Sequence, residues 1–143
     1  MKYSNLQVRF LSGVFASLLS LSTLAELVVE EGYVRAPIPG RSMSAAFMTI
    51  NNTGSTDVVL KTASIEGAKS VEMHTHSHKD GVMSMRQLHE LTIKAGKSVV
   101  LAPGGLHLMV FGINKLPVNP QLTLCDDENQ CTQFQLAVRK LVQ

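Results

Sequence analysis

Four soft donor side chains, two imidazoles and two thioethers, are spread along the second half of the chain: His74, Met85, His107 and Met109. His107 and Met109 are one residue apart, and residues i and i+2 of a β-strand point to the same face of a sheet. A strand here would therefore present one imidazole and one thioether together. The set holds neither carboxylate nor thiolate, and imidazole with thioether suits monovalent copper better than magnesium, calcium or zinc. These four residues predict a copper(I) site.

The spacing of the four residues resembles the signature of a known family. Ten residues separate His74 from Met85, twenty-one separate Met85 from His107, and one separates His107 from Met109. This pattern, H-x10-M-x21-H-x-M, is similar to that of the periplasmic copper chaperones called PCuAC. Three surrounding segments resemble the same family: residues 45–54, 80–86 and 101–109. The resemblance extends over most of residues 34–138.

The PCuAC resemblance implies a cupredoxin-like β-sandwich that binds copper through the four motif residues and catalyses nothing. It implies delivery of copper to the copper centres of a respiratory oxidase, with a second periplasmic copper or thiol chaperone as a further partner. The absence of G-x-S-x-G and H-E-x-x-H motifs agrees with a protein that is not a hydrolytic enzyme. Two alternatives stay open: a periplasmic copper buffer or resistance protein, and a copper redox protein. A blue-copper carrier of the latter kind would need a Cys thiolate beside two His.

Three further residues are candidates for the metal site: His76, His78 and Met83. Asp80-Gly81 predicts a two-residue hairpin turn, which would place His78 opposite Met83 and His76 opposite Met85. Residues His74, His76 and His78 would then share one face, with His74 diagonal to Met85. The two extra imidazoles are either a solvated strand edge or nitrogen donors for divalent copper. Met83 either packs in the core or lies near the metal.

The remaining His and Met side chains have no such spacing. Met73 is adjacent to His74 and should face the opposite side of a regular strand. Met43, Met48 and Met73 are therefore expected to pack in the core, and His89 to lie on the surface.

Residues 1–25 resemble an export signal. Lys2 and Arg9 form a basic start, residues 10–21 are apolar, and residues 23–25 form a small-residue cleavage site. The uncharged run is shorter than the ~20 residues of a membrane-spanning helix, and no cysteine lies near the cleavage site for acylation. We expect cleavage after Ala25, a periplasmic location without stable membrane insertion, and one copper-binding β domain over residues 26–143.

Removing the signal changes the charge of the chain. Residues 1–25 contain two basic residues and no acidic one, so the thirteen Lys and Arg fall by two to eleven, equal to the eleven Asp and Glu. The mature chain should be close to neutral. Neither nucleic acid nor an anionic membrane surface is expected as a partner.

The two cysteines, Cys125 and Cys131, lie either side of a short polar run. In an exported protein such a pair usually forms a disulfide, here across a hairpin with strands over residues 121–125 and 132–138. A thiolate metal site and a redox couple are the alternatives. The spacing is not C-x-x-C, and no neighbouring basic residue would lower a thiol pKa.

The rest of the chain alternates short β-prone runs with turns. It predicts about eight or nine strands and no long helical pattern outside the signal. This pattern predicts an all-β fold, an antiparallel sandwich or barrel of Greek-key type. The predicted segments are residues 27–29 with 33–34, then 46–51, 58–65, 71–78, 82–88, 98–101, 106–111, 121–125 and 132–138.

Overall fold

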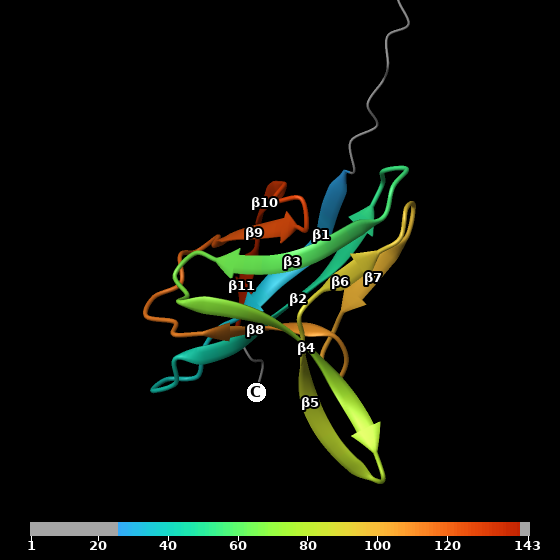
Figure 1. The fold of residues 1–143 in the computed structure, drawn as a ribbon. Coiled ribbons are helices and arrows are strands. Elements are labelled where there is room, and N and C mark those ends of the chain that lie inside the picture. Colours follow the sequence, from blue (N-terminus) through green and yellow to red (C-terminus); the bar gives the residue numbers. More distant parts are fainter. Residues whose placement is uncertain (1–25, 141–143) are drawn as a thin grey trace, which may run out of the picture.

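The computed structural model describes residues 26–140, and in this part of the chain all regular secondary structure is β-strand (Figure 1). The eleven strands are, in chain order, β1 (Leu27–Arg35), β2 (Met43–Asn52), β3 (Val58–Ile65), β4 (Ser70–Lys79), β5 (Val82–Leu88), β6 (Leu91–Ile93), β7 (Ser98–Leu101), β8 (His107–Phe111), β9 (Gln121–Asp126), β10 (Cys131–Gln135) and β11 (Ala137–Arg139).

The strands form two sheets. The larger sheet has seven strands in the order β11-β1-β2-β8-β4-β5, with β7 also pairing with β2. The smaller sheet has four strands in the order β10-β9-β3-β6. Within the described residues, all strand pairs are antiparallel except β1 with β11. The predicted all-β class is confirmed, and the architecture is an open sandwich rather than a closed barrel.

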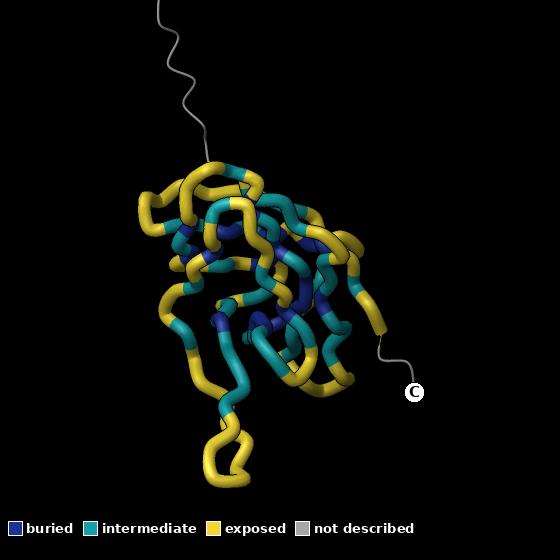
Figure 2. The backbone as a smooth tube through the Cα atoms, turned by 90° about the vertical axis from the view of Figure 1, so that its right-hand side faces the viewer, coloured by how far each residue is buried: buried dark blue, intermediate teal, exposed yellow. Residues whose placement is uncertain are grey.

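The core lies between the sheets and is built by strand alternation. In β2, Ala46, Met48 and Ile50 are buried on the inner face, and in β9 Leu122 and Leu124 meet them from the smaller sheet. Side chains of successive residues point to opposite faces, so these apolar positions bury one side of each sheet. Figure 2 shows the buried segments in the interior of the molecule. The other face of the larger sheet is left available for a site.

Two details of the strand prediction are wrong. Residues 91–93, which were not expected to form a strand, pair with β3 as β6. The segment 132–138, expected to be one strand, is two strands in different sheets: β10 pairs with β9, and β11 pairs in parallel with β1. Leu136 separates them, with its side chain in the core and its N–H donating to the Pro120 carbonyl. One straight strand could not pair with partners in both layers.

The β4–β5 hairpin has the register that the Asp80-Gly81 turn predicts. Both turn residues have positive φ, 54° and 79°, as a two-residue type I′ turn requires. His76 pairs with Met85 and His78 pairs with Met83. The distal half of the hairpin extends beyond the body of the sandwich (Figures 1 and 2).

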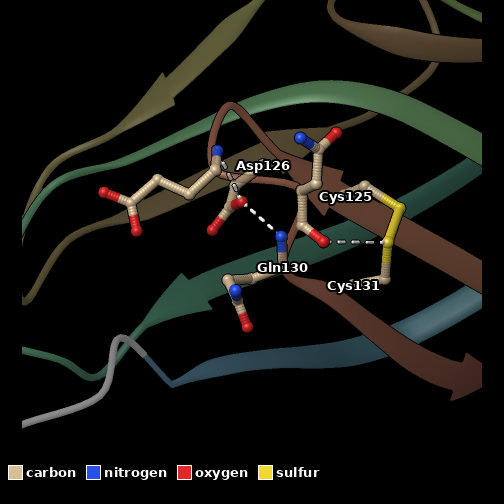
Figure 3. Close-up of a disulfide and its surroundings, with 6 residues drawn as sticks. Cys125, Asp126, Gln130 and Cys131 are labelled. Atoms are coloured by element: carbon tan, nitrogen blue, oxygen red, sulfur yellow. Dashed lines mark hydrogen bonds between the residues drawn. A yellow bond between two sulfur atoms is a disulfide. The ribbon is translucent and has the colours of Figure 1, made fainter.

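A disulfide joins Cys125 and Cys131, which are directly opposed residues of β9 and β10 with a Cα–Cα distance of 4.1 Å. In the intervening loop, the Asp126 carboxylate accepts hydrogen bonds from the Glu128 and Gln130 N–H groups at 3.0 and 2.7 Å (Figure 3). The pair lies in the smaller sheet. No free cysteine is found in the described part of the chain.

The predicted signal segment, residues 1–25, lies outside the described residues. Within residues 26–140, we find no helix that is both long and apolar enough to cross a bilayer.

Of the three methionines expected in the core, Met48 and Met73 are buried there. The prediction for Met43 is wrong, because it is 44% exposed: it pairs with Phe111 on the outer face of the larger sheet.

Candidate metal centre

Two histidines of the motif meet on the outer face of the larger sheet. β4 and β8 are neighbouring strands, and His74 is the direct cross-strand partner of His107, so both side chains point to the same face. Their ring centroids are 6.0 Å apart. The ring of His76, two residues along β4, lies 5.2 Å from that of His107. Register alone therefore gathers three imidazoles from segments far apart in the sequence.

A carboxylate fixes the protonation pattern of His74. Nε2 of His74 lies 2.8 Å from the Glu72 carboxylate oxygen. Because a carboxylate can only accept, Nε2–H is the donor, and the neutral ring carries its lone pair on Nδ1. That Nδ1 atom is buried and has no hydrogen-bond partner. A buried acceptor without a partner costs about 1–3 kcal/mol, which a bound cation would recover.

A backbone carbonyl fixes which ring nitrogen of the neutral His107 side chain carries the proton. Its Nδ1 lies 2.9 Å from the Gly105 carbonyl oxygen, so Nδ1–H donates and Nε2 keeps the lone pair. The tight turn before β8 brings that carbonyl into reach, with Gly104 at a φ of 83° and the Gly105 N–H donating to Ala102. The His107 side chain is buried. It has the arrangement typical of a metal-ligating imidazole, with the second ring nitrogen held by the protein.

Met109 completes a small pocket beside these rings. It follows His107 on β8 and pairs with Glu72 on one side and Ala45 on the other. His107 and Met109 both border a pocket of about 160 Å³. Its lining residues are Arg35, Ala45, Phe47, His76, Pro103, Gly104, His107 and Met109. The thioether and two imidazoles therefore share one cavity.

Met85 lies on the same face but outside this pocket. It is 55% exposed on β5, opposite His76 and diagonal to His74. Met83, further along the hairpin, is 61% exposed beside the exposed His78. His74, His76, His107 and Met109 are thus gathered, Met85 borders them, and His78 with Met83 lies further out.

The arrangement favours a soft ion. Among residues 26–140, no three His, Cys, Asp or Glu side chains converge closely enough to hold a metal ion by themselves. A set of neutral imidazoles and thioethers suits monovalent copper better than hard divalent ions. The two preset lone pairs, on His74 and His107, fit such an ion.

The sequence analysis missed two residues that shape the site, Glu72 and Phe47. Glu72 is two residues from His74 on a predicted strand, so strand alternation could have placed both on one face. Phe47 is buried on the outer face, with its ring centroid 6.4 Å from that of His107. No local pattern around Phe47 signals this contact, which depends on β2 pairing with β8.

Both sequence matches to known proteins are described as putative lipoproteins. A family model described as "Putative lipoprotein LpqE-like" matches residues 27–125. Putative lipoprotein Lxx21020 from Leifsonia xyli subsp. xyli (strain CTCB07) is 35% identical over 86 residues, which are 59% of this chain and 51% of that protein. The chain thus spans about half the length of this curated relative.

Solved structures give the fold. The copper-bound PCuAC domain from PmoF2 is 21% identical with a TM-score of 0.65, covering 82% of this chain and 96% of that one. The CuI form of DR1885 from Deinococcus radiodurans is 24% identical with a TM-score of 0.67, covering 90% and 87%. This chain therefore has the fold of PCuAC domains, which confirms the sequence resemblance at the level of architecture.

Proposed function

This chain belongs to the LpqE-like family of putative lipoproteins, and on that premise we propose that it binds monovalent copper as a cargo and passes it to an acceptor protein. The observation that carries the proposal is the pair of preset lone pairs on His74 Nδ1 and His107 Nε2. Met109 borders the same pocket as His107 and lies diagonal to His74 on the same sheet face. PCuAC domains that share the fold have been solved with copper, in PmoF2 and DR1885.

In this proposal His74, His107 and Met109 form the inner ligands and Met85 approaches from the hairpin. The exposed Met85 thioether is free to move toward His74, its diagonal neighbour. Binding would bury part of the Met85 side chain and restrain the hairpin. His76 and His78 would add nitrogen donors for divalent copper, which prefers them over thioethers.

The chemistry of the ligands suits transfer. Thioether and neutral imidazole carry no negative charge and, unlike thiolates, are not lost to disulfides in an oxidising compartment. An acceptor can replace the exposed Met85 first and the buried ligands afterwards. Following the PCuAC resemblance, the proposed acceptor is a copper centre of a respiratory oxidase, and the proposed compartment is the periplasm after cleavage at Ala25.

A copper buffer with the same site but no dedicated acceptor is the second candidate. A blue-copper redox protein is less well supported, because Cys125 and Cys131 are joined in the smaller sheet and the site would lack the thiolate that such a centre needs. An intense visible absorption band of the copper-loaded protein would favour the redox reading. Copper transfer to an oxidase subunit would separate chaperone from buffer.

The proposal is tested by titration of monovalent copper against a coloured chelator. Met109→Leu removes the sulfur while keeping a similar apolar volume. Copper affinity should fall by about 100-fold, the upper end of the loss seen when only an outer partner of a metal ligand is removed. Met43→Leu changes an outer-face methionine that is outside the ligand set and should leave affinity as it is. Equal affinity of Met109→Leu and wild type would overturn the ligand assignment.

A further inference from the structure

Three arginines lie on the outer face of the larger sheet beside the candidate metal centre: Arg35, Arg41 and Arg139, here called the arginine rim. Arg35 on β1 is the direct partner of Arg139 on β11, so both side chains point to the same face. Arg35 borders the pocket that holds His107 and Met109. Arg41, on the exposed loop before β2, lines an adjoining hollow of about 240 Å³ that also includes Met109.

The charges of the arginine rim are not neutralised within the described residues. The ion pairs in this part of the chain use Lys61, Lys94 and His74, and none involves an arginine. The nearby Glu72 carboxylate is engaged by His74. Like charges on neighbouring positions of one sheet face repel each other. The Arg35–Arg139 pair is thus an arrangement that a negatively charged group would stabilise.

Aromatic rings hold two of these guanidinium groups in place. The Arg35 guanidinium carbon lies 5.1 Å from the centroid of the Phe47 ring, and that of Arg139 lies 4.1 Å from the Tyr33 ring. Tyr33 and Phe47 are in contact, with centroids 5.4 Å apart. Stacking restrains a guanidinium group without occupying the N–H edge that binds carboxylates. Arg35 and Arg139 are therefore oriented before any partner arrives.

The hollow between the rim and Met109 is largely apolar. Ile38 and Met43 line it and are 52% and 44% exposed. An apolar patch bordered by arginines is typical of the centre of a protein interface, where Arg and Met are enriched and Lys and Asp are depleted. Because the hollow shares Met109 with the metal pocket, a protein seated here would reach the copper ligands directly.

We propose that the arginine rim docks an acidic face of the copper-accepting protein. The carboxylates of the acceptor would pair with the arginines, and its own copper ligands would lie next to Met109. This inference rests on the proposed function and adds the chemistry of the partner. Without residues 1–25, the chain has eleven basic and eleven acidic residues, so any steering must come from this local cluster. Guanidinium–carboxylate pairs are commonly bidentate and orient the two surfaces.

Two synthetic peptides with the same Met-x-Met copper ligands, one flanked by Asp and one by Lys, provide the test. Stopped-flow transfer from the copper-loaded protein to the Asp peptide should be about tenfold faster at low salt, as electrostatic steering predicts, and the advantage should vanish in ~1 M salt. In Arg41→Glu/Arg139→Glu the preference should reverse toward the Lys peptide. The control is Lys94→Gln/Lys97→Gln, in the turn at the far end of β2, where Asn51 pairs with Ser98. It should keep the wild-type preference.

The same peptides added to the metal-free protein separate this inference from the proposed function. Chemical-shift changes at the Arg35 and Arg139 side chains with the Asp peptide alone would support docking even if copper binding failed. Equal transfer rates and equal shifts for both peptides would overturn the inference and leave the copper proposal standing.

Discussion

At the scale of single residues, the two histidines His74 and His107 are held in opposite tautomers by different partners. Glu72 holds Nε2 of His74, and the Gly105 carbonyl holds Nδ1 of His107. Each ring therefore presents its free nitrogen without rearrangement. Such outer partners set both the orientation and the basicity of a ligand, so Glu72 should act as a positioning residue for copper.

Replacing Glu72 by Leu should release the tautomer of His74 and weaken monovalent copper binding by about 10–100-fold, the usual effect of losing the partner of a ligating histidine. Long-range nitrogen–proton NMR on the metal-free protein reports the tautomer, and chelator competition reports the affinity. Glu72→Gln keeps an oxygen acceptor and should retain both properties. A Leu variant with the wild-type tautomer and affinity would show that Glu72 is a surface carboxylate only.

His76 has an additional unsatisfied ring nitrogen, since its Nδ1 is buried without a partner. His76→Ala/His78→Ala should weaken divalent copper binding selectively, because divalent copper prefers nitrogen donors. Paramagnetic resonance of the copper(II)-loaded protein and chelator competition for copper(I) measure the two effects. The exposed His89→Ala is the control. Equal loss for both oxidation states would place these residues in the primary site.

At the scale of elements, the β4–β5 hairpin connects a buried ligand to exposed ones. Exposure rises outward, from the partly buried His74 to Met85 and Met83, which are 55% and 61% exposed. The hairpin projects past the sandwich (Figure 1). The distal residue pairs of β4 and β5 therefore contact little besides one another. Elements with such low contact are the ones that move during binding.

Gly81→Ala should disturb this hairpin without touching the core. Gly81 has a φ of 79° and nothing within 4 Å of the added Cβ, so the cost is conformational, about 1 kcal/mol. Faster amide exchange in β5 and a weaker copper affinity are expected. Gly96→Ala carries the same kind of strain, with a φ of 65° and open space, in a turn remote from the site. Affinity lost equally in both variants would show that hairpin geometry does not matter.

The elements also show what local sequence can predict. The register of His76 with Met85 followed from Asp80-Gly81, because a two-residue turn fixes the pairing of the strands beside it. The division of residues 132–138 at Leu136 could not be predicted, since it depends on which sheet each half joins. The Phe47–His107 contact likewise depends on the pairing of β2 with β8, and the arginine rim on the pairing of β1 with β2 and β11. No short sequence pattern encodes these pairings.

At the scale of the whole molecule, the two sheets have different tasks. The larger sheet carries the candidate metal centre and the arginine rim on its outer face, whereas the smaller sheet carries the disulfide. The bridge closes a short loop, so it restrains the β9–β10 register more than it adds stability.

Cys125→Ser/Cys131→Ser should therefore lower the free energy of unfolding by about 2 kcal/mol, from the chain-entropy relation for a short loop. Copper affinity should stay at the wild-type value, because no thiolate contributes to the proposed site. Denaturant unfolding and chelator competition measure the two quantities. A large loss of copper affinity in a variant that remains folded would move the metal to the cysteines.

The central claim is that thioether sulfur and imidazole nitrogen bind monovalent copper together on one sheet face. X-ray absorption at the copper edge, on protein loaded anaerobically with copper(I), tests it most directly. We predict a mixed nitrogen and sulfur shell that loses its sulfur in Met85→Leu/Met109→Leu. A sulfur shell that is unchanged in this variant, or a wild-type shell without sulfur, would contradict the claim.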